Sequence, residues 1–413
     1  MNLQIDQQRL TRELQDLSAI SAAPAPVVTR VLFTEADLRA RAFMKQLCAD
    51  AGLVVREDPV GNTFARWVGA EPDLAAVGTG SHIDAIPNAG MYDGTVGVLG
   101  GLEAMRTLAR AGYRPRRSIE LVIFTAEEPT RFGIGCLGSR LLAGVLDAAA
   151  GESLKDKEGL SLNQARATAY FTGPLSAVKL PSGYYSAFVE LHIEQGPILE
   201  KKQLEIGVVT AIAAPASLHI LIEGEGGHAG AVLMPDRHDA FLAAGEIALA
   251  IEAAAKSSGS VDTVATTGVC DVFPGAVNSI ASRVRLEVDV RDIDLARRDA
   301  VLRRTAEATE ATAARRGVTI RTEMINADAP AQCAASVVDA LELACQTHRA
   351  TYQRMISRAY HDSLFMSSIA PTAMLFIPSR GGFSHRPDEY SSPEAIAQGT
   401  LILAETLASL ASS

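Results

Sequence analysis

Residues 74–94 read LAAVGTGSHIDAIPNAGMYDG, an apolar run that meets a turn at a histidine and two aspartates. Residues 74–80 are typical of a buried strand, and residues 94–111 are typical of a helix that Gly112 closes. The same strand-like character returns in residues 118–125, 187–191 and 372–377. Strands that alternate with helices in this way predict an α/β fold, with a mixed sheet flanked by helices.

Polar residues suited to metal binding follow these strand-like runs. They are His82 and Asp84 in an H-x-D pair, Asp93, the pair Glu127 and Glu128, His192, and His385. An open α/β sheet presents its reactive groups at the carboxyl ends of its strands, so we expect these side chains to gather at one edge. Three imidazoles with several carboxylates are too hard and too mixed a set for a structural thiolate zinc site. They suit two divalent ions that share one carboxylate, as in a dinuclear metallohydrolase.

Each of these residues also has an ordinary structural explanation. An isolated H-x-D pair is weak evidence, Asp93 could be a helix N-cap, and the glutamate pair could be a solvated strand end. The histidines could be hydrogen-bonded residues of the core. Five positions in the same strand-end context favour a site, in which Asp93, after a tight turn at residues 87–90, is the candidate bridge. One glutamate can then bind metal while its neighbour, which points elsewhere, handles protons.

The pattern changes character between residues 214 and 326. Strand-like runs occupy residues 218–223, 261–273, 283–292 and 318–325, and helix-like runs occupy residues 239–255 and 295–316. This β-α-β-β-α-β order is the ferredoxin-like plan. Because the metal-type residues lie on both sides of the block, we predict a discontinuous catalytic domain of residues 1–213 and 327–413. The inserted α+β domain would be residues 214–326.

Composition narrows the classes of function. A chain of 413 residues favours two domains, and a formal net charge of −10 argues against nucleic acid or an anionic membrane as a partner. The five cysteines are odd in number and form no C-x-x-C pair, which indicates reduced thiols. The charged start is unlike a signal peptide, and no apolar run reaches the roughly 18 residues of a membrane span. We therefore expect a cytoplasmic protein.

Three residues of the insert are of interest although each has a plain explanation. His228 lies in the glycine loop 226–230, where a surface histidine is ordinary. Asn278 looks like a turn asparagine, and Arg291 lies on the polar face of an alternating strand. From the residues alone, the plain explanation is favoured for Arg291 and Asn278.

Seven segments together carry a resemblance to a known family. In order they are GSHIDAIPNAGMYDG (80–94), FTAEEPTRF (124–132), ELHIEQGPILE (190–200), GGHAGAVLMP (226–235), PGAVNSI (274–280), SRAYHDSLF (357–365) and FIPSRGGFSHRPDEYSSPE (376–394). This set resembles the amidohydrolase branch of the dinuclear metallopeptidase superfamily, which contains N-carbamoyl-L-amino acid hydrolases and allantoate amidohydrolases. The similarity covers nearly the whole chain and is greatest to ureidoglycolate amidohydrolases. Residues 379–382 look more like those of general carbamoylases.

The resemblance implies a role for each matching residue. His82, Asp93 and His192 would bind one divalent ion, and Asp93, Glu128 and His385 the other, with manganese expected and zinc the alternative. Glu127 would be the general base and Asp84 would orient His82. The substrate site would be lined by Gln195, His228, Asn278, Arg291, Tyr360 and His361. The inserted domain would form a homodimer in which His228 completes the partner's active site and stabilises an oxyanion.

The implied activity is hydrolysis of the ureido C–N bond of a small carboxylate substrate. Ureidoglycolate is the expected substrate, giving glyoxylate, ammonia and carbon dioxide. The alternatives within the branch are N-carbamoyl-L-amino acids and allantoate. A rival of another class is a relative that binds ligands without catalysis, but no metal or base position is missing, which argues against it. A peptidase is a third option.

Overall fold

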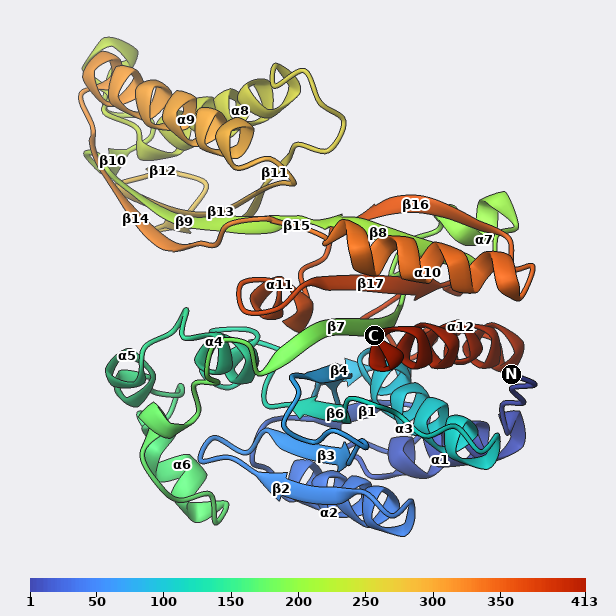
Figure 1. The fold of residues 1–413 in the computed structure, drawn as a ribbon. Helices are drawn as coiled ribbons and strands as arrows, with labels where there is room; N and C mark the ends of the chain where they lie inside the picture. Colours follow the sequence, from blue (N-terminus) through green and yellow to red (C-terminus); the bar gives the residue numbers. More distant parts are fainter. The chain divides into compact units, whose positions relative to one another are not determined.

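The computed structural model describes residues 1–413, which form two compact units (Figure 1). The first unit contains Met1–Thr210, Cys333–Ser357 and His361–Ser413. The second contains Ala211–Gln332 and the short return segment Arg358–Tyr360. The second unit thus begins and ends slightly outside the expected insert of residues 214–326.

A mixed sheet forms the centre of the first unit. Its strands are β2 (Val54–Glu57), β3 (Thr63–Trp67), β4 (Ala76–His82), β6 (Ile119–Phe124), β7 (Tyr185–Ile193), β8 (Ile206–Ile212), β16 (Tyr352–Ser357) and β17 (Thr372–Ile377). The order is β8-β17-β7-β4-β6-β3-β2, with β16 paired to β8 and β15 (Ala331–Gln332) paired to the end of β8. The four central strands β17, β7, β4 and β6 are mutually parallel, and the outer pairs are antiparallel. The carboxyl ends of the central strands therefore meet at one edge.

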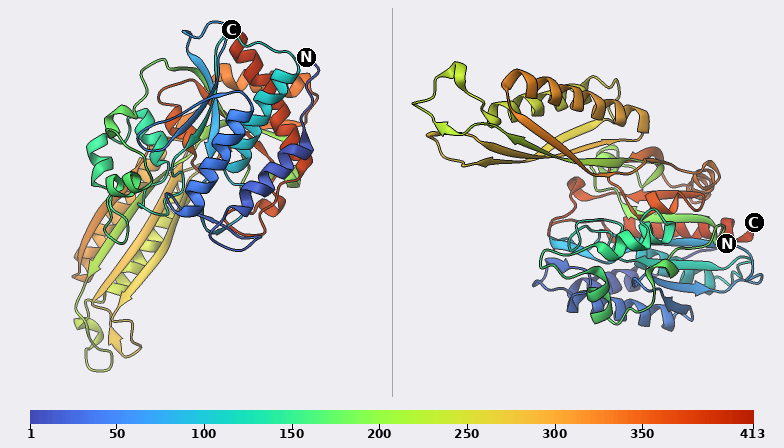
Figure 2. Two further views of the ribbon diagram at one scale, coloured as in Figure 1. Left: turned by 90° about the horizontal axis from the view of Figure 1, so that it is seen from below. Right: turned by 90° about the vertical axis from the view of Figure 1, so that its left-hand side faces the viewer.

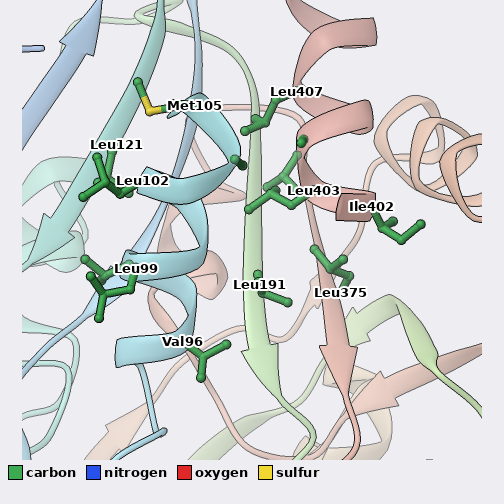
Figure 3. Close-up of a cluster of buried hydrophobic side chains, with 14 of the residues drawn as sticks. Val96, Leu99, Leu102, Met105, Leu121, Leu191, Leu375, Ile402, Leu403 and Leu407 are labelled. Carbon is green, nitrogen blue, oxygen red and sulfur yellow. The ribbon is translucent and has the colours of Figure 1, made fainter. Parts of the chain in front are cut away.

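Helices cover both faces of this sheet. They are α1 (Gln7–Ala19), α2 (Glu35–Asp50), α3 (Thr95–Arg110), α4 (Leu137–Ala143), α5 (Ala148–Ser153), α6 (Leu162–Thr168), α7 (Ile198–Lys202), α10 (Ala335–Thr347), α11 (Asp362–Met366) and α12 (Pro393–Ser412). Because strand side chains alternate between faces, Leu121 and Ile123 of β6 join a core with α1, α2, α3, α10 and α12. Val122 and Phe124 join a second core with α4, α6 and α11. Figure 3 shows the first core, where Leu99 and Leu403 lie among buried leucines of the strands.

Helix α3 lies unusually close to the sheet. A Cβ atom at Gly97 would lie 2.3 Å from the carbonyl oxygen of Leu191, and one at Gly100 would lie 2.8 Å from the same leucine's side chain. At Gly101 the nearest atom, from Leu121, would be at 2.9 Å. Three glycines on one face thus let the helix backbone approach β6 and β7. The residue immediately before its N-cap Gly94 is Asp93.

Two sequence expectations need correction in this unit. Residues 87–89 of the expected turn at 87–90 instead belong to β5 (Ala85–Ala89), which pairs antiparallel with β1 (Val28–Arg30), and Gly90 follows the strand. Helix α12 is long and apolar enough, by length and composition, to cross a membrane, contrary to the expectation that no segment would be. However, 56% of its apolar window is buried inside the protein, and Ile402, Leu403 and Leu407 are fully buried in the core.

The second unit contains an antiparallel sheet with the strand order β11-β13-β9-β14. Its elements are β9 (Ala214–Glu223), α8 (Ala240–Lys256), β11 (Val264–Phe273), β13 (Arg283–Asp292), α9 (Leu295–Arg316) and β14 (Thr319–Ala327), with a small pair of β10 (Gly227–His228) and β12 (Ser279–Ile280). Both helices lie on one face of the sheet (Figures 1 and 2). The predicted ferredoxin-like order is therefore present, and the predicted fold class is confirmed.

Candidate dinuclear metal centre

The central parallel strands place the metal-type residues together. His82 is the last residue of β4, His192 is the penultimate residue of β7, and the glutamate pair follows β6. His385 lies in the loop after β17. Strand ends that are far apart in the sequence thus supply one cluster, as the alternation of strands and helices indicates.

Asp93 lies between the histidines and faces them with both oxygens. Its Oδ1 is 3.4 Å from Nε2 of His82 and 3.3 Å from Nε2 of His192. Its Oδ2 is 3.5 Å from Nε2 of His385. The ligand-type atoms of His82, Asp93 and His192 lie within 4.8 Å of one another, and so do those of Asp93, Glu128 and His385. One carboxylate shared by two triads is the arrangement of a dinuclear site.

The imidazoles are oriented by backbone carbonyl groups. Nδ1 of His82 lies 3.1 Å from the carbonyl oxygen of Asp84, and Nδ1 of His192 lies 2.9 Å from that of Ile193. A proton on each Nδ1 leaves the Nε2 lone pair for a metal ion. Nε2 of His82 is buried and makes no hydrogen bond, so an ion at this place would satisfy it. Nε2 of His192 accepts a hydrogen bond of 3.1 Å from the Gly94 amide.

Asp84 supports the centre in two ways. Its Oδ1 lies 3.5 Å from Nδ1 of His82, in keeping with the orienting role implied by the resemblance. Its two oxygens also accept hydrogen bonds from the backbone amides of Glu127 and Glu128, at 3.2 and 3.1 Å. One carboxylate therefore fixes the end of β4 to the residues after β6.

Glu127 and Glu128 have different surroundings, as the adjacent positions suggest. Glu128 Oε1 is 3.3 Å from Nε2 of His385, whereas Glu127 Oε2 faces Nε2 of His82 at 3.8 Å and belongs to neither triad. Burial, together with the nearby Glu128 carboxylate, raises the pKa of Glu127 well above its ordinary value, although His82 opposes the shift. A carboxylate that lies beside the two triads and belongs to neither is placed to accept and return a proton.

Glu389 and Ser384 also hold Asp93, although the strand-end pattern of the sequence predicts neither of them. Glu389 Oε1 accepts hydrogen bonds from the backbone amides of Tyr92 and Asp93, at 2.8 and 3.0 Å. Ser384 Oγ lies 2.5 Å from Asp93 Oδ2 and 2.8 Å from Glu389 Oε2. Burial and the charge of Asp93 raise the pKa of Glu389 to about 7. The residues lie in the quoted segment 376–394, but only the fold brings them to Asp93.

Two of the expected substrate residues contact the metal-type residues directly. Gln195 donates its side-chain amide to Asp93 Oδ2 at 2.7 Å. The His361 ring lies 4.5 Å from the His192 ring, centre to centre, and its Nε2 is 3.1 Å from Ser357 Oγ. Burial and the neighbouring His192 lower the pKa of His361 well below its ordinary value, so this ring is neutral. His361 thus packs behind a metal-type histidine, a position that gives it a part in holding His192.

The other expected substrate residues belong to the second unit. His228 pairs with Ser279 across β10 and β12, and the carbonyl of Asn278 accepts the Ala229 amide at 2.9 Å, so these two residues are neighbours. Arg291 donates Nε to Asp289 Oδ1 at 2.7 Å on β13. Tyr360 lies in the return segment 358–360. Their participation in one substrate site with the metal-type residues stays a prediction.

Comparisons with known proteins agree with this geometry. The model of peptidase family M20/M25/M40 matches residues 78–409. The ureidoglycolate hydrolase of Arabidopsis thaliana is 52% identical over 418 residues, which cover 99% of this chain and 87% of that protein. The N-carbamoyl-L-amino acid amidohydrolase of Geobacillus stearothermophilus is 38% identical, with 98% and 99% covered. The crystal structure of AtUAH in complex with glyoxylate superposes with a TM-score of 0.89 at 52% identity, covering 99% of this chain and 98% of that one.

Proposed function

The chain belongs to peptidase family M20/M25/M40, and we propose that it hydrolyses the ureido C–N bond of ureidoglycolate. Its named relatives are amidohydrolases, so the predicted hydrolase class and the predicted family resemblance are confirmed. The observation that carries the substrate is the 52% identity to a ureidoglycolate hydrolase over 99% of the chain. A lower identity of 38% to an N-carbamoyl-L-amino acid amidohydrolase makes such amino acids the second candidate substrate.

The two triads fit a pair of divalent ions. His82 and His192 would bind one ion, Glu128 and His385 the other, and Asp93 both. Mixed imidazole and carboxylate ligands suit manganese or zinc, and we propose manganese as the physiological metal. When bound, such ions polarise a carbonyl oxygen and lower the pKa of a coordinated water.

Glu127 is the residue that moves the proton. Its Oε2 takes a proton from the water that attacks the carbamoyl carbon and delivers it to the departing nitrogen as the C–N bond breaks. The products are carbamate and 2-hydroxyglycine, which decompose to carbon dioxide, ammonia and glyoxylate. Asp84 and Cys136 are the side chains that hold this region in place, through the Glu127 amide and its carboxylate respectively.

Substrate recognition requires groups that match a carboxylate and a ureido group. Arg291 has the guanidinium that binds a carboxylate through two parallel hydrogen bonds, and Asn278 and Gln195 offer amides for the ureido group. We propose that the enzyme is a homodimer in which His228 of one subunit stabilises the oxyanion in its partner's site. The five free cysteines fit a cytoplasmic location, where thiols remain reduced.

One experiment tests the substrate. Purified protein loaded with manganese is assayed for glyoxylate formed from ureidoglycolate, and in parallel for amino acids released from N-carbamoyl-L-amino acids. The Glu127→Gln variant with the same metal content is the negative control, which reveals activity from contaminating enzymes in the preparation. We expect glyoxylate to form with the higher kcat/KM. Faster release of amino acids would give the second candidate preference, and cleavage of dipeptides alone would make the protein a peptidase.

A further inference from the structure

The carboxylate of Glu127 makes one hydrogen bond, and its partner is a thiol. Cys136 donates its Sγ hydrogen to Glu127 Oε1 at 3.5 Å. The other oxygen, Oε2, is the one that faces Nε2 of His82 at 3.8 Å. The two oxygens of the carboxylate therefore have distinct surroundings, with a thiol on one side and the metal-type residues on the other.

The backbone fixes the position of this thiol. The Cys136 amide donates to the Glu127 carbonyl at 2.8 Å, and the Leu137 amide donates to the Ala126 carbonyl at 2.9 Å. Cys136 and Ala126 both have left-handed backbone conformations, with φ of 54° and 53°. Such conformations are costly for residues other than glycine and are concentrated at functional sites. The chain thus holds a side chain at position 136 where glycine would fit the backbone more easily.

The thiol also keeps its proton. Cys136 is completely buried, and burial raises the pKa of its thiol well above the ordinary value, with the charge of Glu127 acting in the same direction. A neutral thiol is a donor, and its only acceptor here is the carboxylate.

We propose that Cys136 is a positioning residue for Glu127: its thiol holds Oε1, so that Oε2 stays turned toward the reacting atoms. The role rests on the proposed function of Glu127 as the base but not on the identity of the substrate. A carboxylate without this hydrogen bond is free to rotate about its terminal torsion, and misplacement of a reacting group lowers the rate of the chemical step. Binding of substrate and of metal does not depend on the contact.

Three variants and one control test the proposal. Cys136→Ala and Cys136→Gly remove the donor, and the glycine also relieves the left-handed backbone at φ 54°. Cys136→Ser keeps a donor. Cys48→Ala removes another completely buried thiol, in α2, which belongs to the hydrophobic core. For each protein we would measure metal content, melting temperature, kcat and KM.

We expect kcat to fall about tenfold in both Cys136→Ala and Cys136→Gly, well short of the roughly 10²–10⁴-fold effect of a general base. KM and metal content should stay at wild-type values, Cys136→Ser should recover most of kcat, and Cys48→Ala should be unchanged. The proposal is overturned if the alanine and glycine variants keep wild-type kcat, or if serine is as impaired as alanine. It is also overturned if kcat follows the melting temperature across the set, because that result indicates a structural role.

The choice of substrate separates this inference from the proposed function. The comparison uses whichever ureido compound the wild-type enzyme hydrolyses fastest, including N-carbamoyl-L-amino acids. Failure to hydrolyse ureidoglycolate would overturn the substrate and leave the Cys136 comparison intact. If Glu127→Gln kept its activity, Glu127 would not be the general base, and the proposed role of Cys136 would be overturned with it.

Discussion

Gln195 donates a hydrogen bond of 2.7 Å from its side-chain nitrogen to Oδ2 of Asp93. The amide oxygen of the same side chain is buried and has no hydrogen-bond partner. An unpaired buried acceptor costs free energy, and a ureido N–H group is a donor that would satisfy it. The backbone of Gln195 has φ of 54°, so the residue is held in a conformation that glutamine rarely adopts.

We therefore expect Gln195→Ala to lower kcat/KM by a factor equivalent to about 1–3 kcal/mol, the usual effect of removing a buried hydrogen-bond partner. Steady-state kinetics with ureidoglycolate would measure it. Gln195→Glu keeps the acceptor but loses the donor to Asp93, so it should impair metal binding as well. Unchanged kinetics in the alanine variant would remove Gln195 from the substrate site.

Asp93→Ala should lose both metal ions and all activity, because Asp93 belongs to both triads. Metal content by mass spectrometry, after removal of free ions, is the measurement. Asp388→Ala serves as the control, since Asp388 is an exposed carboxylate on the loop of His385, paired with Arg386. Retention of two ions by the Asp93 variant would refute the bridge.

The adjacent glutamates should respond differently to the same chemical change. Glu127→Gln keeps the shape but removes the base, so kcat should fall by roughly 10²–10⁴ while metal content stays near normal. Glu128→Gln should weaken one ion, because Glu128 faces His385 within a triad. If Glu127→Gln lost an ion while Glu128→Gln kept its metal and lost activity, the two roles would be reversed.

Inactive subunits should complement one another if His228 acts across the dimer. Mixing His228→Ala with Glu127→Gln subunits would form heterodimers, in which one site has a wild-type Glu127 and a wild-type His228 from the other subunit. We expect partial recovery of glyoxylate formation, measured after subunit exchange is demonstrated with tagged chains. No recovery despite exchange would mean that His228 acts within its own subunit or has no role.

Arg291→Ala should lose about 2–4 kcal/mol of transition-state binding, on the scale of a broken charge pair. Arg291→Lys should not recover it, because lysine cannot make two parallel hydrogen bonds. Arg291 already donates Nε and Nη2 to Asp289, at 2.7 and 3.4 Å, and Nη1 to the Arg358 carbonyl at 3.4 Å, so a carboxylate would have to replace the two longer bonds of the terminal nitrogens. The loss should be much smaller for a substrate analogue with an amide in place of the carboxylate.

The matched control for this position is Arg285→Ala. Arg285 lies on the same strand and pairs with Asp271 and Glu287, without a predicted role in binding. Its removal should leave kcat/KM unchanged for the acid and the amide alike. If Arg291→Ala impairs both substrates equally, Arg291 is a structural residue.

The positions of the metal-type residues were predictable, because the hydrophobic pattern of the sequence shows where a strand lies and where it ends. The strand Thr372–Ile377 and the helix Leu295–Arg316 have the predicted bounds, and the polar residues after the central strands do meet. Glu389 and Cys136 were not predicted, because their partners lie far along the chain or depend on local left-handed backbone. These hydrogen bonds form only when the folded chain brings the residues together, so no periodic pattern in the sequence predicts them.

Helix α3 has a consequence for protein engineering. Replacing glycine with alanine inside a helix ordinarily raises stability by about 1 kcal/mol, so a thermostabilisation campaign would choose this helix early. Here a methyl group at position 97 would lie 2.3 Å from the backbone carbonyl oxygen of Leu191, which cannot turn aside, whereas methyl groups at positions 100 and 101 would meet only the ends of the Leu191 and Leu121 side chains, at 2.8 and 2.9 Å. Alanine at position 97 would push the start of the helix off β7, and Asp93 with it, away from His82 and His192. In this enzyme Gly97→Ala should therefore lower both the amount of bound metal and the melting temperature, the opposite of the usual gain from this substitution in a helix.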